Sequence, residues 1–411
     1  MDIELHYYIN YILAQGAGIS SDVAYKIAYS AQYVDDNTEH YVVLERKNFT
    51  QYNNIITQSL NLNLNTKDII GLYPIFHFIP GDEIFKTSSL RRDGAYRYMT
   101  TTPDSKLARL ALKRALVSND PYYIGIASHA YADTWAHQNF TGLKDVYNCV
   151  NFQQTNQVTK ALAVACIGHS NVLSVPDSAN ITWYDFRLKD MKIDNQLRLL
   201  EASHALFKMY IKYADASIAP NKPKNPARVW KELSQKIQAI LKNDFEFLKS
   251  IFGSKCGLKS NKSFLMAKIL GMNSDHRIEL YKTLANQHSE YELEKYNKNK
   301  WIQTAMCEVC DSIKVYDSSI VNDNLNIPKQ ADFALCDGGN AQYGIDMPDI
   351  KNKVFKMLGL NKNIHVWRND HYKTYDWYNF QEAAKKHYDY MLDKVLKIMR
   401  KDIAIMQKAN S

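Results

Sequence analysis

The chain has 411 residues, of which 46% are hydrophobic and 23% charged, and its net charge is +8. With only 15 glycines and 10 prolines, this composition excludes a disordered chain and a fibrous repeat, and the length predicts two or three domains or one large helical body with an appended module. The longest apolar run, residues 161–167, is far shorter than the roughly 20 residues of a membrane-spanning helix, so we predict no such helix.

The acidic residues near Met1 and the lack of a following apolar run argue against a secretory signal, so we expect a cytoplasmic location in the producing cell.

The first half of the chain is predicted to be mainly α-helical. Between the helices we expect a short strand at 41–44 and an aromatic turn bracketed by Pro74 and Pro80. Apolar spacing and N-cap residues predict helices over 3–17, 21–34, 105–117 and 121–137.

The second half begins after a proline-rich segment, 219–226, which we interpret as a linker between domains 1–218 and 227–411. Residues 1–218 carry 20 Lys and Arg against 21 Asp and Glu, while the remainder carries 31 against 22, so all the surplus positive charge lies in the second half. Loops or short strands are expected over 312–350. Helical patterning predicts helices over 229–252, 277–300 and 377–411.

The last of these helices is basic and amphipathic. Tyr388, Met391, Val395 and Ile398 recur at three- and four-residue spacing, and lysines and arginines surround them. Such a helix can contact an anionic lipid surface or nucleic acid. A terminal helix docked on its own domain, with a solvated lysine face, is the interpretation that we favour.

Three metal-ligating side chains share one face of the predicted helix over 121–137. His129, Asp133 and His137 stand four residues apart, and each four-residue step advances about 6 Å with about 40° of rotation. Imidazole nitrogens and carboxylate oxygens are common zinc ligands, and a carboxylate between two histidines can bridge two ions about 3.5–4 Å apart. The pattern predicts a metal site, although any one of these residues alone has an ordinary structural interpretation.

Further metal-competent residues precede position 180, where one fold can bring them together. His6 lies on the first predicted helix, His77 lies in the aromatic turn, and His169 follows a glycine. Three acidic residues complete the set: Asp35, Asp36 and Asp177. Each has a plain alternative as an exposed polar residue or a turn residue.

The six cysteines are too sparse for the disulfide framework of a small secreted domain, so we expect a reducing compartment. Cys307 and Cys310 form one C-x-x-C pair, but a structural zinc site needs a second pair of ligands. We interpret them as two buried thiols.

The segment 123–141 resembles the core motif of the bacterial zinc-dependent phospholipases C, in which a His-x3-Asp helix is followed by a further His and an Asn-Phe-Thr-like tail. More distantly, it is similar to the single-strand nucleases that share this all-helical, trinuclear zinc fold. The resemblance assigns His77 to the upstream ligand, Asp35 or Asp36 to the aspartate before it, and His6 to the first helix. It covers about the first 180 residues and implies a helical zinc domain with an additional α-rich C-terminal region.

Two features depart from that family. Its secreted members use the amino group of a processed N-terminal tryptophan as a zinc ligand, whereas this chain begins with Met1. Their last helix carries His-x3-Glu or His-x3-Asp, whereas Leu173 stands four residues after His169, so Asp177 is the expected substitute. We therefore expect two or three zinc ions. The match is closer to the signal-less, effector-like members, and this implies export by a specialised secretion system as an alternative to a cytoplasmic location.

The resemblance implies a phospholipase C that releases a phosphorylated head group by attack of a metal-activated water. Asp35 or Asp36 would be the general base, and Tyr131 and Trp135 would receive a choline-type cation. The alternatives are a nuclease or nucleotidase of the same fold, with nucleic acid the less favoured substrate, and a non-catalytic helical protein that binds a membrane or a partner. No zincin, P-loop or α/β-hydrolase motif is present.

Overall fold

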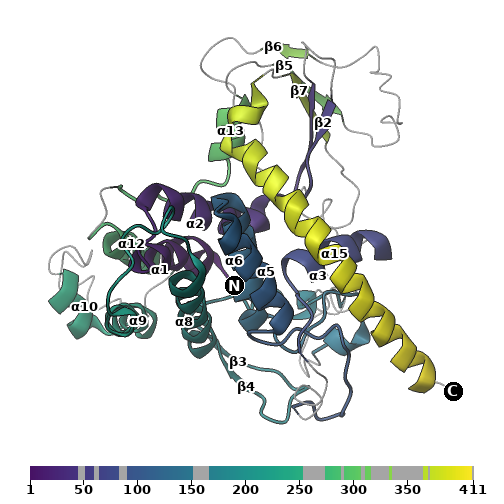
Figure 1. The fold of residues 1–411 in the computed structure, drawn as a ribbon. Helices are drawn as coiled ribbons and strands as arrows, with labels where there is room; N and C mark the ends of the chain where they lie inside the picture. The colour runs from purple at the N-terminus through teal and green to yellow at the C-terminus, as the bar shows by residue number, and fades with distance from the viewer. Residues whose placement is uncertain are drawn as a thin grey trace.

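The structure is a computed structural model that describes residues 1–44, 51–59, 64–82, 90–150, 166–252, 274–287, 291–306, 311–315, 333–335, 364–368 and 371–409. Helices dominate these residues, which confirms the predicted mainly α fold (Figure 1). The helices of the first half are η1 (Glu4–Ile9), α1 (Asn10–Gly16), α2 (Ser21–Asp36), α3 (Thr66–Phe76), α5 (Lys106–Ser118), α6 (Pro121–Ala136), η2 (Val146–Asn148), η3 (Ser170–Val172) and α8 (Asn195–Tyr213). Those of the second half are α9 (Pro226–Lys242), α10 (Phe245–Phe252), α12 (Ser274–Ala285), α13 (Lys300–Met306), η6 (Tyr372–Thr374) and α15 (Asp376–Ala409).

Local sequence signals set the starts of the two helices that lead to the candidate site. Ser105 caps α5, because its side chain accepts a hydrogen bond from the backbone N–H of Ala108. Asp120 caps α6 in the same way by accepting from the N–H groups of Tyr122 and Tyr123, and a proline occupies the first helical position. Both predicted helices are therefore confirmed within one residue at each end.

Helix α6 is the centre of the molecule and is enclosed by α2, α5, α8 and α15 (Figure 1). All its residues from Tyr123 to Ala136 are buried. The contact with α2 is close because residue 125 is a glycine: a Cβ there would lie 2.4 Å from the carbonyl oxygen of Ile27 and 2.5 Å from Cβ of Ser30. This close approach sets the distance between ligand residues on α2 and α6.

We expect Gly125→Ala to destabilise the protein by about 1–3 kcal/mol, because the added methyl group has no space between the two helices. Gly71→Ala in α3 is the matched control, since a Cβ there meets its nearest atom, the Tyr388 hydroxyl, at 3.4 Å. Alanine is the better helix former, so this control should be neutral or stabilising. Urea denaturation of both variants checks the prediction, and equal effects would contradict it.

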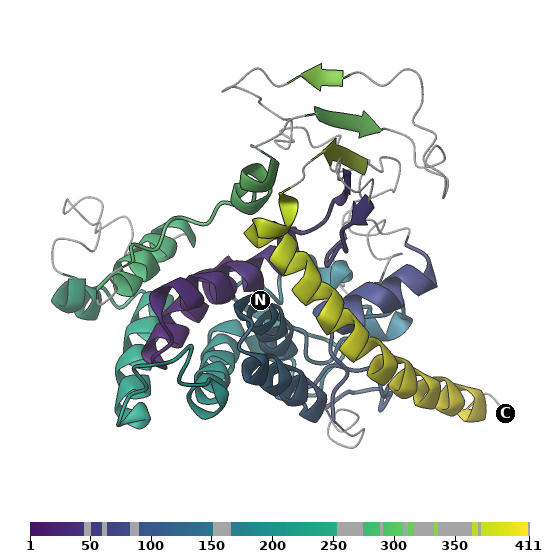
Figure 2. The same cartoon turned by 45° about the horizontal axis from the view of Figure 1, so that its top comes forward.

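Seven short strands form two sheets among the described residues. Their bounds are β1 (His40–Leu44), β2 (Gln51–Asn53), β3 (Thr182–Tyr184), β4 (Lys192–Asp194), β5 (Asp311–Val315), β6 (Phe333–Leu335) and β7 (Ile364–Arg368). The larger sheet has the order β2-β1-β7-β5-β6, and β1 pairs with β7 in parallel. Figure 2 shows the strands of the second half at one end of the molecule, beside the start of α15. The sequence predicted β1, and β5 and β6 fall at or within the range 312–350 where loops or short strands were expected, but β2, β3, β4 and β7 were not predicted.

The C-terminal helix α15 lies across α6 and α3 (Figure 1). Its apolar side chains are buried, among them Phe380, Met391 and Val395. The buried His387 donates from Nε2 to the carbonyl oxygen of Ile75 at 3.1 Å. The helix is therefore docked on the rest of the chain, as we favoured, but on α3 and α6 of the first half and not on the second-half domain to which the sequence assigned it.

The predicted division at 219–226 does not separate two hydrophobic cores. One cluster of buried side chains runs from Met1 to Val395 and includes α9, α12 and α15. Arg277 of α12 forms a buried ion pair with Glu4 of η1, with Nη2 2.6 Å from Oε1. Elements from both sides of the segment therefore build the same core.

Several predicted boundaries were wrong. Pro74 lies inside α3 rather than in a turn, and the predicted helix over 229–252 is two helices, α9 and α10. The helix predicted over 277–300 ends at Ala285, and α8 was not predicted. Among the described residues no helix is both long and apolar enough to cross a membrane.

Candidate metal centre

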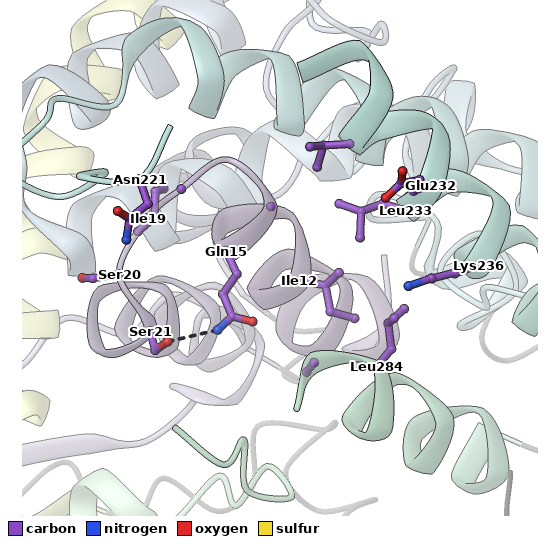
Figure 3. A pocket seen from close by; sticks show the side chains of 14 residues that line it. Ile12, Gln15, Ile19, Ser20, Ser21, Asn221, Glu232, Leu233, Lys236 and Leu284 are labelled. Carbon is purple, nitrogen blue, oxygen red and sulfur yellow. Dashed lines mark hydrogen bonds between the residues drawn. The ribbon is translucent and has the colours of Figure 1, made fainter. Parts of the chain in front are cut away.

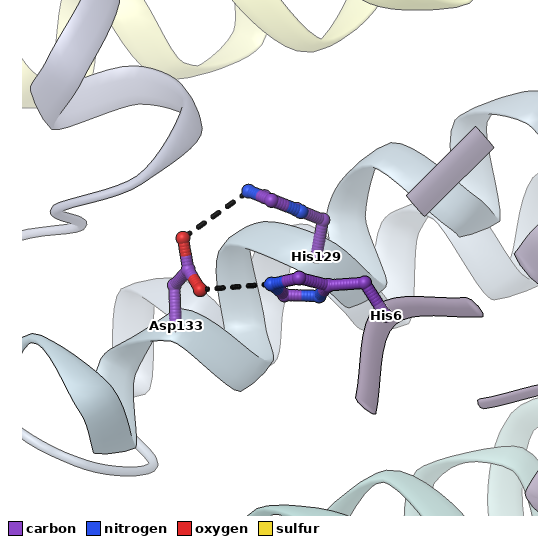
Figure 4. Close-up of side chains that lie close together, drawn as sticks. All are labelled: His6, His129 and Asp133. Carbon is purple, nitrogen blue, oxygen red and sulfur yellow. Dashed lines mark ion pairs between the residues drawn. The ribbon is translucent and has the colours of Figure 1, made fainter. Parts of the chain in front are cut away.

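Helix α6 positions the middle of the candidate site. His129 and Asp133 face the same side of the helix, and His137 is its C-cap residue. The two oxygens of the Asp133 carboxylate face different histidines. Oδ2 lies 3.1 Å from Nε2 of His129, and Oδ1 lies 3.2 Å from Nε2 of His6 on η1 (Figure 4). The side chains of His6, His129, Asp133 and His137 are all buried. The predicted convergence of the α6 ligands with His6 is present.

The amino group of Met1 lies in the same cluster. It is 2.5 Å from Oδ1 of Asp133 and 3.1 Å from Oδ1 of Asp177. We expected Met1 not to supply an amino group to the site. The structure instead places its amino group among the candidate ligands.

A second group forms where α2 and α3 end. His77 is the C-cap residue of α3, and its Nδ1 lies 3.3 Å from Oδ2 of Asp133. Asp35, near the end of α2, places Oδ1 3.7 Å from both Nδ1 of His77 and Nε2 of His129. Its side chain is 29% exposed, so it stands at the open edge of the site. One nitrogen of His129 therefore faces both Asp35 and Asp133.

A third group joins the end of α6 to the loop that follows residue 166. Nε2 of His137 is 2.8 Å from Oδ1 of Asp177, and Nε2 of His169 is 3.1 Å from Oδ2 of the same carboxylate. The two ring nitrogens are 3.2 Å apart. Asp177 supplies the carboxylate from a loop, as the sequence predicted.

The three groups contain eight residues whose nitrogen and oxygen atoms lie within 4.8 Å of one another inside each group. Their members are His6–His129–Asp133, Asp35–His77–His129 and His137–His169–Asp177. His129 belongs to two groups, and the two oxygens of Asp133 face different groups, as a bridging carboxylate requires.

Hydrogen bonds to the backbone determine which ring nitrogens are free to bind a cation. A carbonyl oxygen only accepts, so each ring nitrogen facing one must carry the proton and donate. His77 donates from Nε2 to the carbonyl oxygen of Thr57 at 2.8 Å. His137 donates from Nδ1 to the carbonyl oxygen of His77 at 2.9 Å, and His169 donates from Nδ1 to the carbonyl oxygen of Leu173 at 2.7 Å. In a neutral ring the other nitrogen then points its lone pair into the cluster. In metal sites, carbonyl groups that accept from a histidine ring orient the ring toward the metal in the same way.

Burial keeps most of these rings neutral. It lowers the pKa of His129 and His137, and it lowers the pKa of His6 to about 4. Against the effect of burial, the nearby His169 and the amino group of Met1 hold the pKa of Asp177 well below its usual range. The centre therefore combines the ionised carboxylates of Asp133 and Asp177 with the neutral rings of His6, His129 and His137.

This donor set fits a metal ion. Nε2 of His137, Nε2 of His169 and the carboxylate oxygens of Asp177 converge within about 3 Å. Without metal, a proton on His169, whose pKa Asp177 raises against the effect of burial, relieves the repulsion between these atoms, and a metal ion can take the place of that proton. Nε2 of His6 is buried without a hydrogen-bond partner. Nitrogen and oxygen donors in these numbers suit zinc.

Three of the predicted site residues point elsewhere. Asp36 accepts hydrogen bonds from Tyr296 and Gln32, because one residue along a helix turns the side chain by about 100° from Asp35. Tyr131 donates to Asp104 at 2.6 Å, and Trp135 packs against Tyr131. The last two lie on the opposite face of α6 from Asp133, so the structure does not bring them together with the candidate ligands.

Asp35→Asn should lower metal content and any hydrolytic activity, whereas Asp36→Asn should leave metal content unchanged. Asp35 faces His77 and His129, but Asp36 hydrogen-bonds only to residues outside the cluster. The two residues are adjacent and the two substitutions are equally conservative, so each variant is the control for the other. Mass spectrometry of the purified variants measures the metal. Loss of metal in Asp36→Asn alone would show that the assignment is reversed.

Acid is expected to destabilise the metal-free protein. The folded pKa of His6 is about 4 against 6.5 for the free side chain, so the unfolded chain takes up the proton first as the pH falls. Stability is therefore full above pH 6.5 and falls by on the order of 3 kcal/mol toward pH 4. Urea midpoints of chelator-treated protein at pH 7.5 and 4.5 measure this loss, and His6→Gln should reduce it.

Cys149 and Cys166 form a disulfide with a Cα–Cα distance of 5.5 Å. A disulfide is not what the expected reducing compartment would favour. The spacing of the cysteines along the chain did not identify this pair, because which cysteines meet depends on the fold. Cys307 and Cys310 lie outside the described residues.

A separate cavity of about 500 Å³ lies between α1, α9 and α12 (Figure 3). Its walls combine apolar side chains, among them Ile12, Leu233 and Leu284, with polar ones, among them Glu232 and Lys236. It contains none of the candidate ligands.

The fold and the ligand geometry define a mainly helical protein with a candidate multinuclear metal centre. The chain belongs to DUF6765, a family of unknown function whose model matches residues 1–395. No curated protein and no solved structure matches it. The family spans both halves of the chain, so the second half belongs to the same family unit as the candidate centre.

Proposed function

We propose that this protein is a zinc-dependent phosphodiester hydrolase, and that its substrate is a glycerophospholipid from which it releases the phosphorylated head group. One observation carries the proposal: three histidines each donate one ring N–H to a backbone carbonyl and direct the other nitrogen toward the carboxylates of Asp133 and Asp177. The choice of a phospholipid rests on the resemblance of residues 123–141 to the zinc-dependent phospholipases C.

The ligands divide by position. His77, His129 and Asp35 would hold one ion, and His137, His169 and Asp177 a second. His6 and Asp133, with the amino group of Met1, form the third possible site. When bound, the zinc ions supply positive charge for the phosphodiester oxygens and lower the pKa of a coordinated water.

Asp35 is the residue of this centre best placed to accept a proton. It is more exposed than Asp133, so water and substrate can reach it. Burial and the nearby charge of Asp133 raise its pKa well above the usual value, which makes its carboxylate a stronger base at neutral pH. Asp133 and Asp177, which are strongly ionised, are better suited to hold cations.

The test combines metal analysis with turnover. Purified protein is analysed for zinc by mass spectrometry and assayed on phosphatidylcholine vesicles, before and after a chelator and after added zinc. We expect two or three zinc ions per chain and release of phosphocholine that the chelator abolishes and zinc restores. Asp36→Asn serves as the active control and Asp133→Asn as the inactive one.

Other outcomes are equally informative. Bound zinc with hydrolysis of a nucleic acid or nucleotide, but not of lipid, would retain the metal centre and replace the substrate. Absence of bound metal in protein prepared with zinc would contradict the proposal as a whole.

A further inference from the structure

The loop that carries His169 and Asp177 has less regular structure than any other part of the centre. The other ligands lie on η1, α2 and α6 or at the end of α3. Between Cys166 and Asp177 the only helix is the single turn η3, Ser170–Val172. The position of these two ligands therefore depends on contacts outside the loop.

One set of those contacts joins the loop to residues 148–150. Cys166 is joined to Cys149 by the disulfide, and its carbonyl oxygen accepts a hydrogen bond from Nδ2 of Asn148 at 3.2 Å. The N–H of Val150 donates to Oδ1 of Asn171 at 2.7 Å. The covalent bond is the strongest of these connections, and it lies three residues before His169.

The loop also packs against the centre itself. Gly168 has a φ of +52°, and a Cβ at this position would lie 2.4 Å from Cζ of Phe78. The Phe78 ring stacks on the ring of His137 with centroids 4.3 Å apart. A shift of the backbone at residues 166–168 would therefore move His169 and disturb its neighbour His137 together.

We propose that the Cys149–Cys166 disulfide is a positioning element for the ion held by His137, His169 and Asp177, and that its reduction releases this ion selectively. The inference rests on the proposed function, because it assumes that the centre binds metal. His129 and Asp133 lie on the rigid helix α6, so the ions that they hold should remain.

The reduction is a two-electron step. A phosphine reductant attacks one sulfur and the S–S bond breaks; the phosphorus lone pair supplies both electrons, and water supplies the two thiol protons and the oxygen of the phosphine oxide. A phosphine is preferable to a dithiol, because dithiols bind zinc through thiolates and would remove it directly.

The experiment measures zinc per chain in the full-length protein in three states: oxidised, phosphine-treated, and Cys149→Ser with Cys166→Ser. We expect the second and third states to hold one zinc fewer per chain after equilibration with a competing chelator, with affinity for that ion weakened about 10- to 100-fold. Removal of the phosphine and reoxidation should restore the ion. Phosphine treatment starts from folded protein, so it tests the inference even if the double variant folds poorly.

A stability control separates positioning from general loosening. Ile240→Ala removes a fully buried side chain from α9, away from every candidate ligand, and lowers the thermal midpoint. It should keep all its zinc. Equal zinc in all three states, or loss of every ion at once, would overturn the positioning role while leaving the metal centre intact. Absence of zinc in the oxidised protein would instead refute the proposed function, and with it this inference.

Discussion

Asp133→Asn is expected to remove at least one zinc ion per chain and to abolish hydrolysis. The carboxylate of Asp133 faces His6 through one oxygen and His129 through the other, and an amide cannot bridge two cations in this way. Replacement of outer-shell partners costs about 10- to 100-fold in metal affinity, so loss of a bridging ligand should cost more. Mass spectrometry and phosphatidylcholine turnover measure both effects.

Asp104→Asn is the matched control for this experiment. It removes a carboxylate that binds Tyr131 on the opposite face of the same helix, and it should keep the metal. If Asp133→Asn retained all its zinc and full turnover, the bridging role of this carboxylate would be disproved.

The second large effect concerns the first residue of the chain. A glycine added before Met1 converts its amino group to an amide, which has neither a positive charge nor a lone pair for a metal. Met1 is only 5% exposed, so the added residue also lacks space. We expect loss of the ion beside His6, and destabilisation of the metal-free protein by about 3–5 kcal/mol, because the buried Asp133 loses its cationic partner.

Thermal midpoints and zinc content measure this effect, and a glycine added after Ser411 is the control. The metal-free protein should also lose stability in alkali. Although burial opposes it, the charges of Asp133 and Asp177 raise the pKa of the Met1 amino group to about 11 from 8.0. The folded state therefore keeps a proton that the unfolded chain releases, and the stabilisation declines between pH 8 and 11. An N-terminally extended protein with normal zinc and stability would remove Met1 from the centre.

Periodicity predicted much of the candidate centre. Four-residue spacing on a helix is sufficient to place His129, Asp133 and His137 together, and a capping Asp120 fixes where that helix begins. The mainly α class followed from the same patterns. These are local properties, which the order of residues along the chain determines directly.

The parts that sequence did not predict depend on long-range contacts. Spacing alone does not distinguish Asp35 from Asp36, since the distinction depends on how α2 packs on α6 around Gly125. The pairing of Cys149 with Cys166 and the parallel pairing of β1 with β7 join segments that carry no mutual signal in one sequence. An amino group at the start of a chain has no side-chain pattern at all.

The parallel pairing of β1 with β7 has a consequence for the order in which the protein is made. Every candidate ligand precedes residue 178, whereas β7 begins at Ile364 and α15 follows it. At a synthesis rate of about 5–20 residues per second, the ligands leave the ribosome roughly 10 to 40 s before the strand and helix that complete the fold. Throughout that interval the chain holds every candidate ligand but lacks the helix that covers α6 and α3.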